Sequence, residues 1–147
     1  MLKKKPPYGI SNYEKIVTDN FYYIDKTKYV ELLESLPEDY IFFLRPRKFG
    51  KSLFVSMLSY YYGIEHKDRF DKLFGNQYIG SRPTQKANSY YVINFDFSAV
   101  SSQESNVLFN SFNNKILDAI RGFNNSYKCF ESKEMEYFES IEDAPAL

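Results

Sequence analysis

The sequence has no tryptophan, one histidine and one cysteine, and each shortage narrows what the protein can do. Cys129 has no partner for an internal disulfide, which is typical of a reducing compartment. No cysteine or second histidine accompanies His66, so we expect a solvent-exposed residue and not a metal ligand. An excess of charge is also missing, because 19 acidic residues cancel 19 basic ones. That balance predicts neither a nucleic-acid nor a membrane partner.

Long apolar runs are absent as well, and none approaches the length needed to span a bilayer. The basic start of the chain, residues 3–5, leads into Pro6 and Pro7, where a signal peptide would continue with apolar residues. We therefore expect a cytoplasmic protein. A length of 147 residues and 44% hydrophobic content favour one folded domain, residues 1–147, with residues 1–9 as an extended arm.

The most informative stretch covers residues 40–62. An apolar run at 40–44 is followed by a basic loop at 45–51, and an amphipathic segment begins at Ser52. This order predicts a strand, a phosphate loop and a helix, with Gly63 as the helix stop. Gly50-Lys51-Ser52 matches the second half of the G-x-x-x-x-G-K-[ST] signature, in which backbone N–H groups at a helix N-terminus bind phosphate oxygens.

Each position of the loop has an expected role. Gly50 permits a positive φ where the backbone passes close to a phosphate. Lys51 is predicted to reach the β- and γ-phosphates of ATP, and the Ser52 hydroxyl to ligand Mg²⁺. Arg45 replaces the first glycine of the signature, whose task Pro46 can share by fixing the backbone as it leaves the strand. The predicted nucleotide-binding residues are Arg47, Lys48, Phe49, Gly50, Lys51, Ser52 and Leu53.

The loop carries more positive charge than a triphosphate requires. Arg45, Arg47, Lys48 and Lys51 lie within seven residues. We interpret them as a triphosphate site with spare charge, because a helix N-terminus already favours anions. A solvated basic turn and a contact with nucleic-acid phosphates are the alternatives.

Two aspartates outside the loop are further candidates. Tyr90–Phe97 is predicted to be a second strand, and Asp96 lies at its end. An acid in that place holds magnesium in P-loop enzymes, and the alternative is a residue that caps or positions a loop. Asp25 precedes a helical pattern from Lys26 to Leu36, so we expect it to cap that helix.

The sequence resembles the AAA-ATPase-like domain family, which is common in bacteria and joins an N-terminal P-loop domain to a C-terminal nuclease-like domain. The resemblance rests on YGIS at 8–11 with Tyr13, FYYIDKT at 21–27, LRPRKFGKS at 44–52 and VINFDF at 92–97. It implies an α/β fold, a P-loop NTPase-type sheet with flanking helices, and ATP with Mg²⁺ as cofactors. Arginine is the usual residue of that family at the position of Arg45. The segment with Asp25 and Lys26 recurs beside the loop, so the resemblance also implies a nucleotide contact by these two residues.

The resemblance exposes a gap too. The family's magnesium aspartate belongs to an L-I-D-E-Y-D stretch on a later strand, which does not occur before Leu147. By that register Asp96 ends a neighbouring strand instead. The chain is therefore expected to be the N-terminal portion of the domain or a degenerate member. An incomplete sheet has an exposed edge, which a partner chain or a second copy could cover.

The leading functional interpretation is ATP binding through the variant loop, as the N-terminal part of an AAA-like ATPase. One alternative is a non-hydrolysing regulatory or protein-interaction module that kept the loop. Another is nucleic-acid contact through Arg45, Arg47 and Lys48 in the service of a nuclease domain, which has no support beyond charge.

Overall fold

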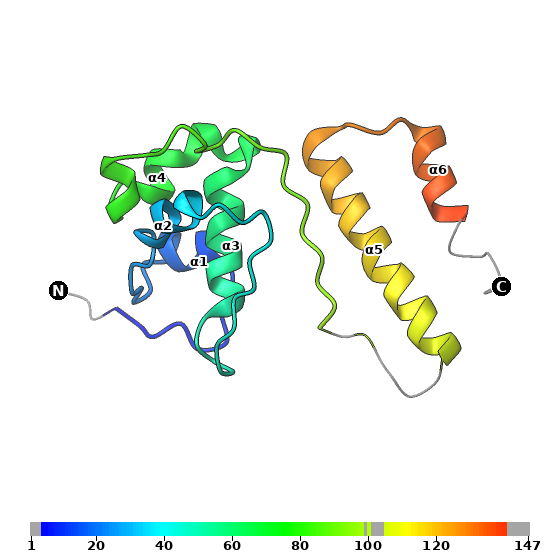
Figure 1. The fold of residues 1–147 in the computed structure, drawn as a ribbon, viewed down its shortest axis with the longest axis horizontal. Helices are drawn as coiled ribbons and strands as arrows, with labels where there is room; N and C mark the ends of the chain where they lie inside the picture. Colours follow the sequence, from blue (N-terminus) through cyan, green and yellow to red (C-terminus); the bar gives the residue numbers. More distant parts are fainter. Residues whose placement is uncertain (1–3, 99, 101–104, 141–147) are drawn as a thin grey trace. The chain divides into compact units, whose positions relative to one another are not determined.

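The computed structural model describes residues 4–98, 100 and 105–140, with the backbone alone for residues 105–107. The chain divides into two compact units, Met1–Tyr91 (unit 1) and Val92–Leu147 (unit 2). Unit 1 contains α1 (Tyr13–Thr18), α2 (Tyr29–Ser35), α3 (Lys51–Tyr62), the 3₁₀ helix η1 (Ile64–Arg69), α4 (Phe70–Phe74) and the 3₁₀ helix η2 (Tyr78–Ser81). Unit 2 contains α5 (Ser105–Tyr127) and α6 (Ser132–Ser140) (Figure 1).

The described residues form helices and no sheet, so the predicted α/β fold with a P-loop NTPase-type sheet is wrong. Their one strand-like pairing is an isolated parallel bridge between Gly63 and Tyr90. Aromatic and β-branched residues favour strands because they suit a half-buried pleated surface, but a strand also needs a neighbour to pair with. Among the described residues Tyr40–Leu44 has no such neighbour, and Tyr90–Phe97 pairs only at the bridge of Tyr90 to Gly63. The proposed partner site at a sheet edge loses its basis with the sheet.

In unit 1 the run Tyr40–Leu44 contacts a helix through one of its rings. Phe43 stacks on Phe54 of α3, with ring centroids 5.0 Å apart. Other side chains of the run are largely exposed, with Tyr40 at 88%, Phe42 at 87% and Leu44 at 77%. The run therefore has the composition of a strand but is not paired with another strand.

In unit 2, residues 92–97 of the second predicted strand contact side chains of α5. The backbone N–H of Val92 donates to the hydroxyl of Tyr127 at 2.9 Å. Phe97 stacks on Phe112 of α5 at 5.0 Å. Contacts with a helix thus take the place of strand pairing. Gly122 and the polar residues after it also predict a turn from Gly122 to Tyr127, and this prediction is wrong because α5 continues through it.

Helix α3 is the central element of unit 1. It runs from Lys51 to Tyr62 with Gly63 as its C-cap, which confirms the helix predicted after the loop. Phe54, Met57 and Tyr61 are buried on this helix, as the apolar stripe indicates. In Figure 1 the helices α1, α2 and α4 lie on one side of α3.

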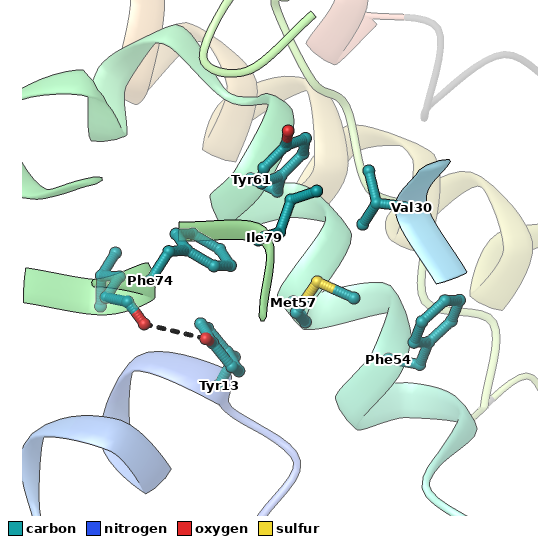
Figure 2. Close-up of a cluster of buried hydrophobic side chains, with 8 residues drawn as sticks. Tyr13, Val30, Phe54, Met57, Tyr61, Phe74 and Ile79 are labelled. Atoms are coloured by element: carbon teal, nitrogen blue, oxygen red, sulfur yellow. Dashed lines mark hydrogen bonds between the residues drawn. The ribbon is translucent and has the colours of Figure 1, made fainter. Parts of the chain in front are cut away.

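Aromatic rings dominate the core around α3 (Figure 2). The buried cluster consists of Tyr13, Val30, Phe54, Met57, Tyr61, Leu73, Phe74 and Ile79. Tyr13 of α1 stacks on Phe74 at 5.1 Å, and its hydroxyl donates to the Leu73 carbonyl at 2.9 Å. Burial raises the pKa of Tyr13 well above its ordinary value, so the hydroxyl is a neutral donor. The ring stacking and this hydrogen bond together join α1 to α4.

His66 is half-buried and not the solvent-exposed residue that we expected. Its ring lies against Tyr60 at 4.4 Å, and Arg69 Nη2 lies 2.8 Å from His66 Nδ1. Its Nε2 lies 3.2 Å from a carboxylate oxygen of Glu65. Burial lowers the pKa of His66, and Arg69 acts in the same direction against the opposing carboxylates. A neutral ring that accepts from Arg69 and donates to Glu65 satisfies both contacts.

Tyr13→Phe should lower the free energy of unfolding by about 1–2 kcal/mol, because the Leu73 carbonyl loses its buried donor. Urea denaturation measures this change. Tyr8→Phe is the matched control, since Tyr8 is 92% exposed. Equal stability of the two variants would contradict a structural role for the Tyr13 hydroxyl.

Candidate phosphate-binding loop

The loop before α3 has a left-handed backbone at two positions, Lys48 with φ 66° and Gly50 with φ 77°. The positive φ expected of Gly50 is thus present. Gly50 is also the N-cap of α3, and its carbonyl accepts from the Phe54 N–H at 2.9 Å. The N–H groups of Lys51, Ser52 and Leu53 precede that first intrahelical bond, so they are free for an outside acceptor. The helix dipole makes this end favourable for anions.

Lys51 closes the loop on itself. Its ammonium donates to the Arg45 carbonyl at 2.6 Å and to the Pro46 carbonyl at 3.1 Å. The side chain is partly buried, whereas the Ser52 side chain beside it is exposed. The positive charge of Lys51 therefore lies at the loop and not in bulk solvent, where a phosphate could exchange with the carbonyl oxygens.

The side chain of Arg45 contacts the two residues that precede the loop. Its guanidinium lies over the ring of Phe43 at 5.7 Å, and Nη1 donates to the Leu44 carbonyl at 3.1 Å. Because Phe43 in turn stacks on Phe54 of α3, the arginine joins the entry of the loop to the helix that follows. The residue that replaces the first glycine of the signature thus has a structural contact.

A second lysine reaches the loop from another part of the chain. The ammonium of Lys26 donates to the Phe49 carbonyl at 3.3 Å. A Cβ atom added at Gly50 would lie 3.6 Å from the same nitrogen. The structure therefore brings together two segments that the sequence analysis treated as separate candidates, the one with Asp25 and Lys26 and the loop itself.

Asp25 and Thr27, on either side of Lys26, hold this segment to η2. One carboxylate oxygen of Asp25 accepts from the Thr27 N–H at 2.8 Å and from its hydroxyl at 2.7 Å. The other accepts from the Tyr78 N–H at 2.7 Å, and the fully buried Thr27 hydroxyl accepts from the Ile79 N–H at 3.1 Å. We call these four hydrogen bonds the Asp25 clasp.

The expected cap on a helix from Lys26 to Leu36 is wrong. Helix α2 begins at Tyr29, its N-cap is Lys28, and no side chain caps it. Asp25 lies three residues before the N-cap, and its carboxylate accepts the hydrogen bonds of the clasp. Its carboxylate can satisfy backbone donors from two segments there, whereas a cap would satisfy only the first turn of one helix.

Comparison with known proteins identifies the family of this chain. A family described as "Predicted AAA-ATPase" matches residues 7–144. The chain belongs to this AAA-ATPase-like family. A protein of Azotobacter chroococcum mcd 1, described as "Uncharacterized protein in vnfD 5'region", is 38% identical over 81 residues. The match covers 48% of this chain and 15% of that protein, so the chain corresponds to a small part of its length. No solved structure matches.

The candidate magnesium residues of this AAA-ATPase-like chain lie in different units, Ser52 in unit 1 and Asp96 in unit 2. Asp96 Oδ1 accepts from the Ser98 N–H at 2.9 Å. Hydrogen bonds from Ser98 lower the pKa of Asp96, and nearby Lys115 contributes in the same direction. That arrangement fits the loop-positioning alternative, and a magnesium role for Asp96 stays a prediction. Among the described residues no three His, Cys, Asp or Glu side chains gather as metal ligands.

The described part of the chain has no helix that is both long and apolar enough for a membrane span.

Sequence analysis missed the partners of Asp25 and Thr27. Tyr78 and Ile79 lie within residues 75–87, where two glycines and a proline predict a surface loop. They contribute backbone N–H groups, which every residue except proline carries. No side-chain pattern could have identified them. The contact of Lys26 with Phe49 likewise uses a backbone carbonyl. Only the recurrence of the Asp25 segment beside the loop pointed to this region.

Asp25→Asn should lower the free energy of unfolding by about 1.5–3 kcal/mol, because an amide nitrogen cannot accept from the Tyr78 N–H or the Thr27 donors. Thermal or urea denaturation measures the loss. Asp39→Asn removes the same charge at an exposed position and should be close to wild type. An Asp25→Asn protein as stable as its Asp39→Asn control would show that the clasp contributes nothing.

Proposed function

We propose that this chain binds ATP together with Mg²⁺ through residues 47–53. The observation that carries the proposal is Gly50 with a positive φ at the start of α3, with the Lys51 ammonium folded onto the carbonyls of the same loop. Membership of a family described as "Predicted AAA-ATPase" supports a nucleotide as the ligand. The free N–H groups and the lysine together suit an anion with several oxygens.

Each loop residue has a part in this proposal. The N–H groups of Lys51, Ser52 and Leu53, with the backbone of Arg47, Lys48, Phe49 and Gly50 before them, would surround the phosphates. Lys51 would exchange the Arg45 and Pro46 carbonyls for phosphate oxygens, which are stronger acceptors because they are charged. The exposed Ser52 hydroxyl at the first turn would supply an oxygen ligand to Mg²⁺. Mg²⁺ held there would neutralise part of the negative charge of the phosphates.

Nucleic-acid contact through the basic loop gains no support. Arg45, one of the three residues named for it, lies over Phe43 and donates to a backbone carbonyl. With 19 acidic residues against 19 basic ones, the chain also has no excess positive charge to hold a polyanion. A non-hydrolysing module is the alternative that we retain, because it needs only the loop.

Lys51→Ala should weaken ATP binding by about 1.5–3 kcal/mol, or roughly tenfold to hundredfold in Kd, because a charged hydrogen-bond donor is lost. Titration calorimetry or a fluorescent ATP analogue measures it. Lys72→Ala is the matched control, since Lys72 is exposed on α4 in the same unit. If wild type and Lys51→Ala had equal affinity, the loop would not be the binding site.

The 147-residue chain alone should release phosphate from magnesium-ATP no faster than Lys51→Ala does. Hydrolysis needs a carboxylate for magnesium and a group that orients water, besides the loop lysine. Asp96 is the one strand-end acid that the sequence offered, and it positions Ser98 in unit 2. Each missing factor of ten corresponds to about 1.4 kcal/mol of barrier. A phosphate-release assay that shows turnover abolished by both Lys51→Ala and Asp96→Asn would assign the magnesium role to Asp96.

A further inference from the structure

We propose that Lys26 is a second phosphate-binding lysine of the loop, held in place by the Asp25 clasp, and that the site takes polyphosphates. The inference rests on the proposed function and adds a residue from outside the loop to it. Its direct observation is the hydrogen bond of 3.3 Å from the Lys26 ammonium to the Phe49 carbonyl, across 23 positions of sequence.

The location of the Lys26 ammonium favours this role. Phe49 and Gly50 immediately precede the free N–H groups of α3. The Lys26 nitrogen donates to the Phe49 carbonyl and lies 3.6 Å from the position that a Cβ atom of residue 50 would take. Lys51 reaches the other end of the same loop, at the Arg45 and Pro46 carbonyls. Two cations thus contact the loop at different points along it. An anion with several charged groups can accept from both, whereas a single phosphate offers fewer oxygens for the same donors.

The clasp explains why Lys26 is there. The residues on both of its sides are fixed, Asp25 to the Tyr78 N–H and Thr27 to the Ile79 N–H. The Lys26 carbonyl accepts from the Tyr29 N–H at 3.1 Å, and the Thr27 carbonyl from the Val30 N–H at 3.0 Å. Its backbone is therefore set by the fold of unit 1 before any ligand binds. Because the lysine is already partly buried at the loop, less conformational entropy remains to be lost on binding.

Lys28 provides an internal comparison. It lies two residues further along, is exposed, and has its ammonium 5.3 Å from the ring centroid of Tyr29. The two lysines share a charge and a segment, but Lys26 donates to the loop whereas Lys28 lies over the ring of Tyr29. A difference between Lys26 and Lys28 variants therefore reports position and not net charge.

The experiment is calorimetric titration of the 147-residue chain with magnesium-ATP and with inorganic triphosphate. Lys26→Met should weaken both ligands about tenfold, since one charged donor is removed. Lys28→Met should bind as wild type does, and Lys26→Arg should recover most of the affinity because it keeps the positive charge. Circular dichroism and melting temperature confirm that each variant is folded.

The outcomes distinguish a failure of the Lys26 proposal from a failure of the proposed ATP binding. If wild type bound neither ligand, or Lys51→Ala bound as tightly as wild type, the proposed function itself would fail. If wild type bound and Lys51→Ala did not, but Lys26→Met matched Lys28→Met, only the role of Lys26 would be refuted. A loss confined to ATP, with inorganic triphosphate unaffected, would place Lys26 on the nucleoside and overturn a phosphate contact. If Lys26→Arg did not recover the affinity and also had a lowered melting temperature, Lys26 would have a structural role only and the phosphate contact would be refuted.

Discussion

The carboxylate of Asp25 accepts three hydrogen bonds, and the arrangement around the candidate phosphate-binding loop depends on them. Two come from Thr27, which fixes the turn into α2, and the third comes from the backbone of η2, more than fifty residues away. A charged acceptor suits this position because each bond to it is worth more than a neutral one. The constraint reaches the loop through Lys26, whose ammonium donates to the Phe49 carbonyl. Both the stability of the fold and the geometry of the candidate site thus depend on the Asp25 carboxylate.

The features predicted correctly from sequence are those that neighbouring residues determine. The start of α3, its end at Gly63 and the positive φ of Gly50 follow from residues within one helical segment. The sheet was wrong because strand formation depends on a distant partner, and the apolar residues of Tyr40–Leu44 look the same with or without one. The turn predicted at Gly122 was wrong because a local signal was too weak. A single glycine costs a helix only about 1 kcal/mol, which packing on either side can override, and α5 continues to Tyr127.

The candidate site was predictable in part for the same reason. Its loop is one continuous segment, so Lys51 and Ser52 could be named from their spacing. The approach of Lys26 and the bonds from Tyr78 and Ile79 are contacts between segments, made largely through backbone atoms that leave no mark on the sequence. Family resemblance partly compensated, because a segment that recurs with the loop is a candidate to touch it. It suggested Asp25 as a nucleotide contact, which stays a prediction, and in the structure the Asp25 carboxylate accepts three hydrogen bonds of the clasp.

The exposed run Tyr40–Leu44 has a consequence for how this chain behaves at high concentration. Five consecutive apolar residues without charge, largely open to solvent, are the kind of segment that nucleates cross-β aggregation. Their flanks oppose it. Pro37, Glu38 and Asp39 precede the run, and Arg45 and Pro46 follow it, so both ends carry a charge and a proline of the gatekeeper type. Arg45, which replaces the first glycine of the phosphate-loop signature, therefore also limits how far a neighbouring copy can pair along the run.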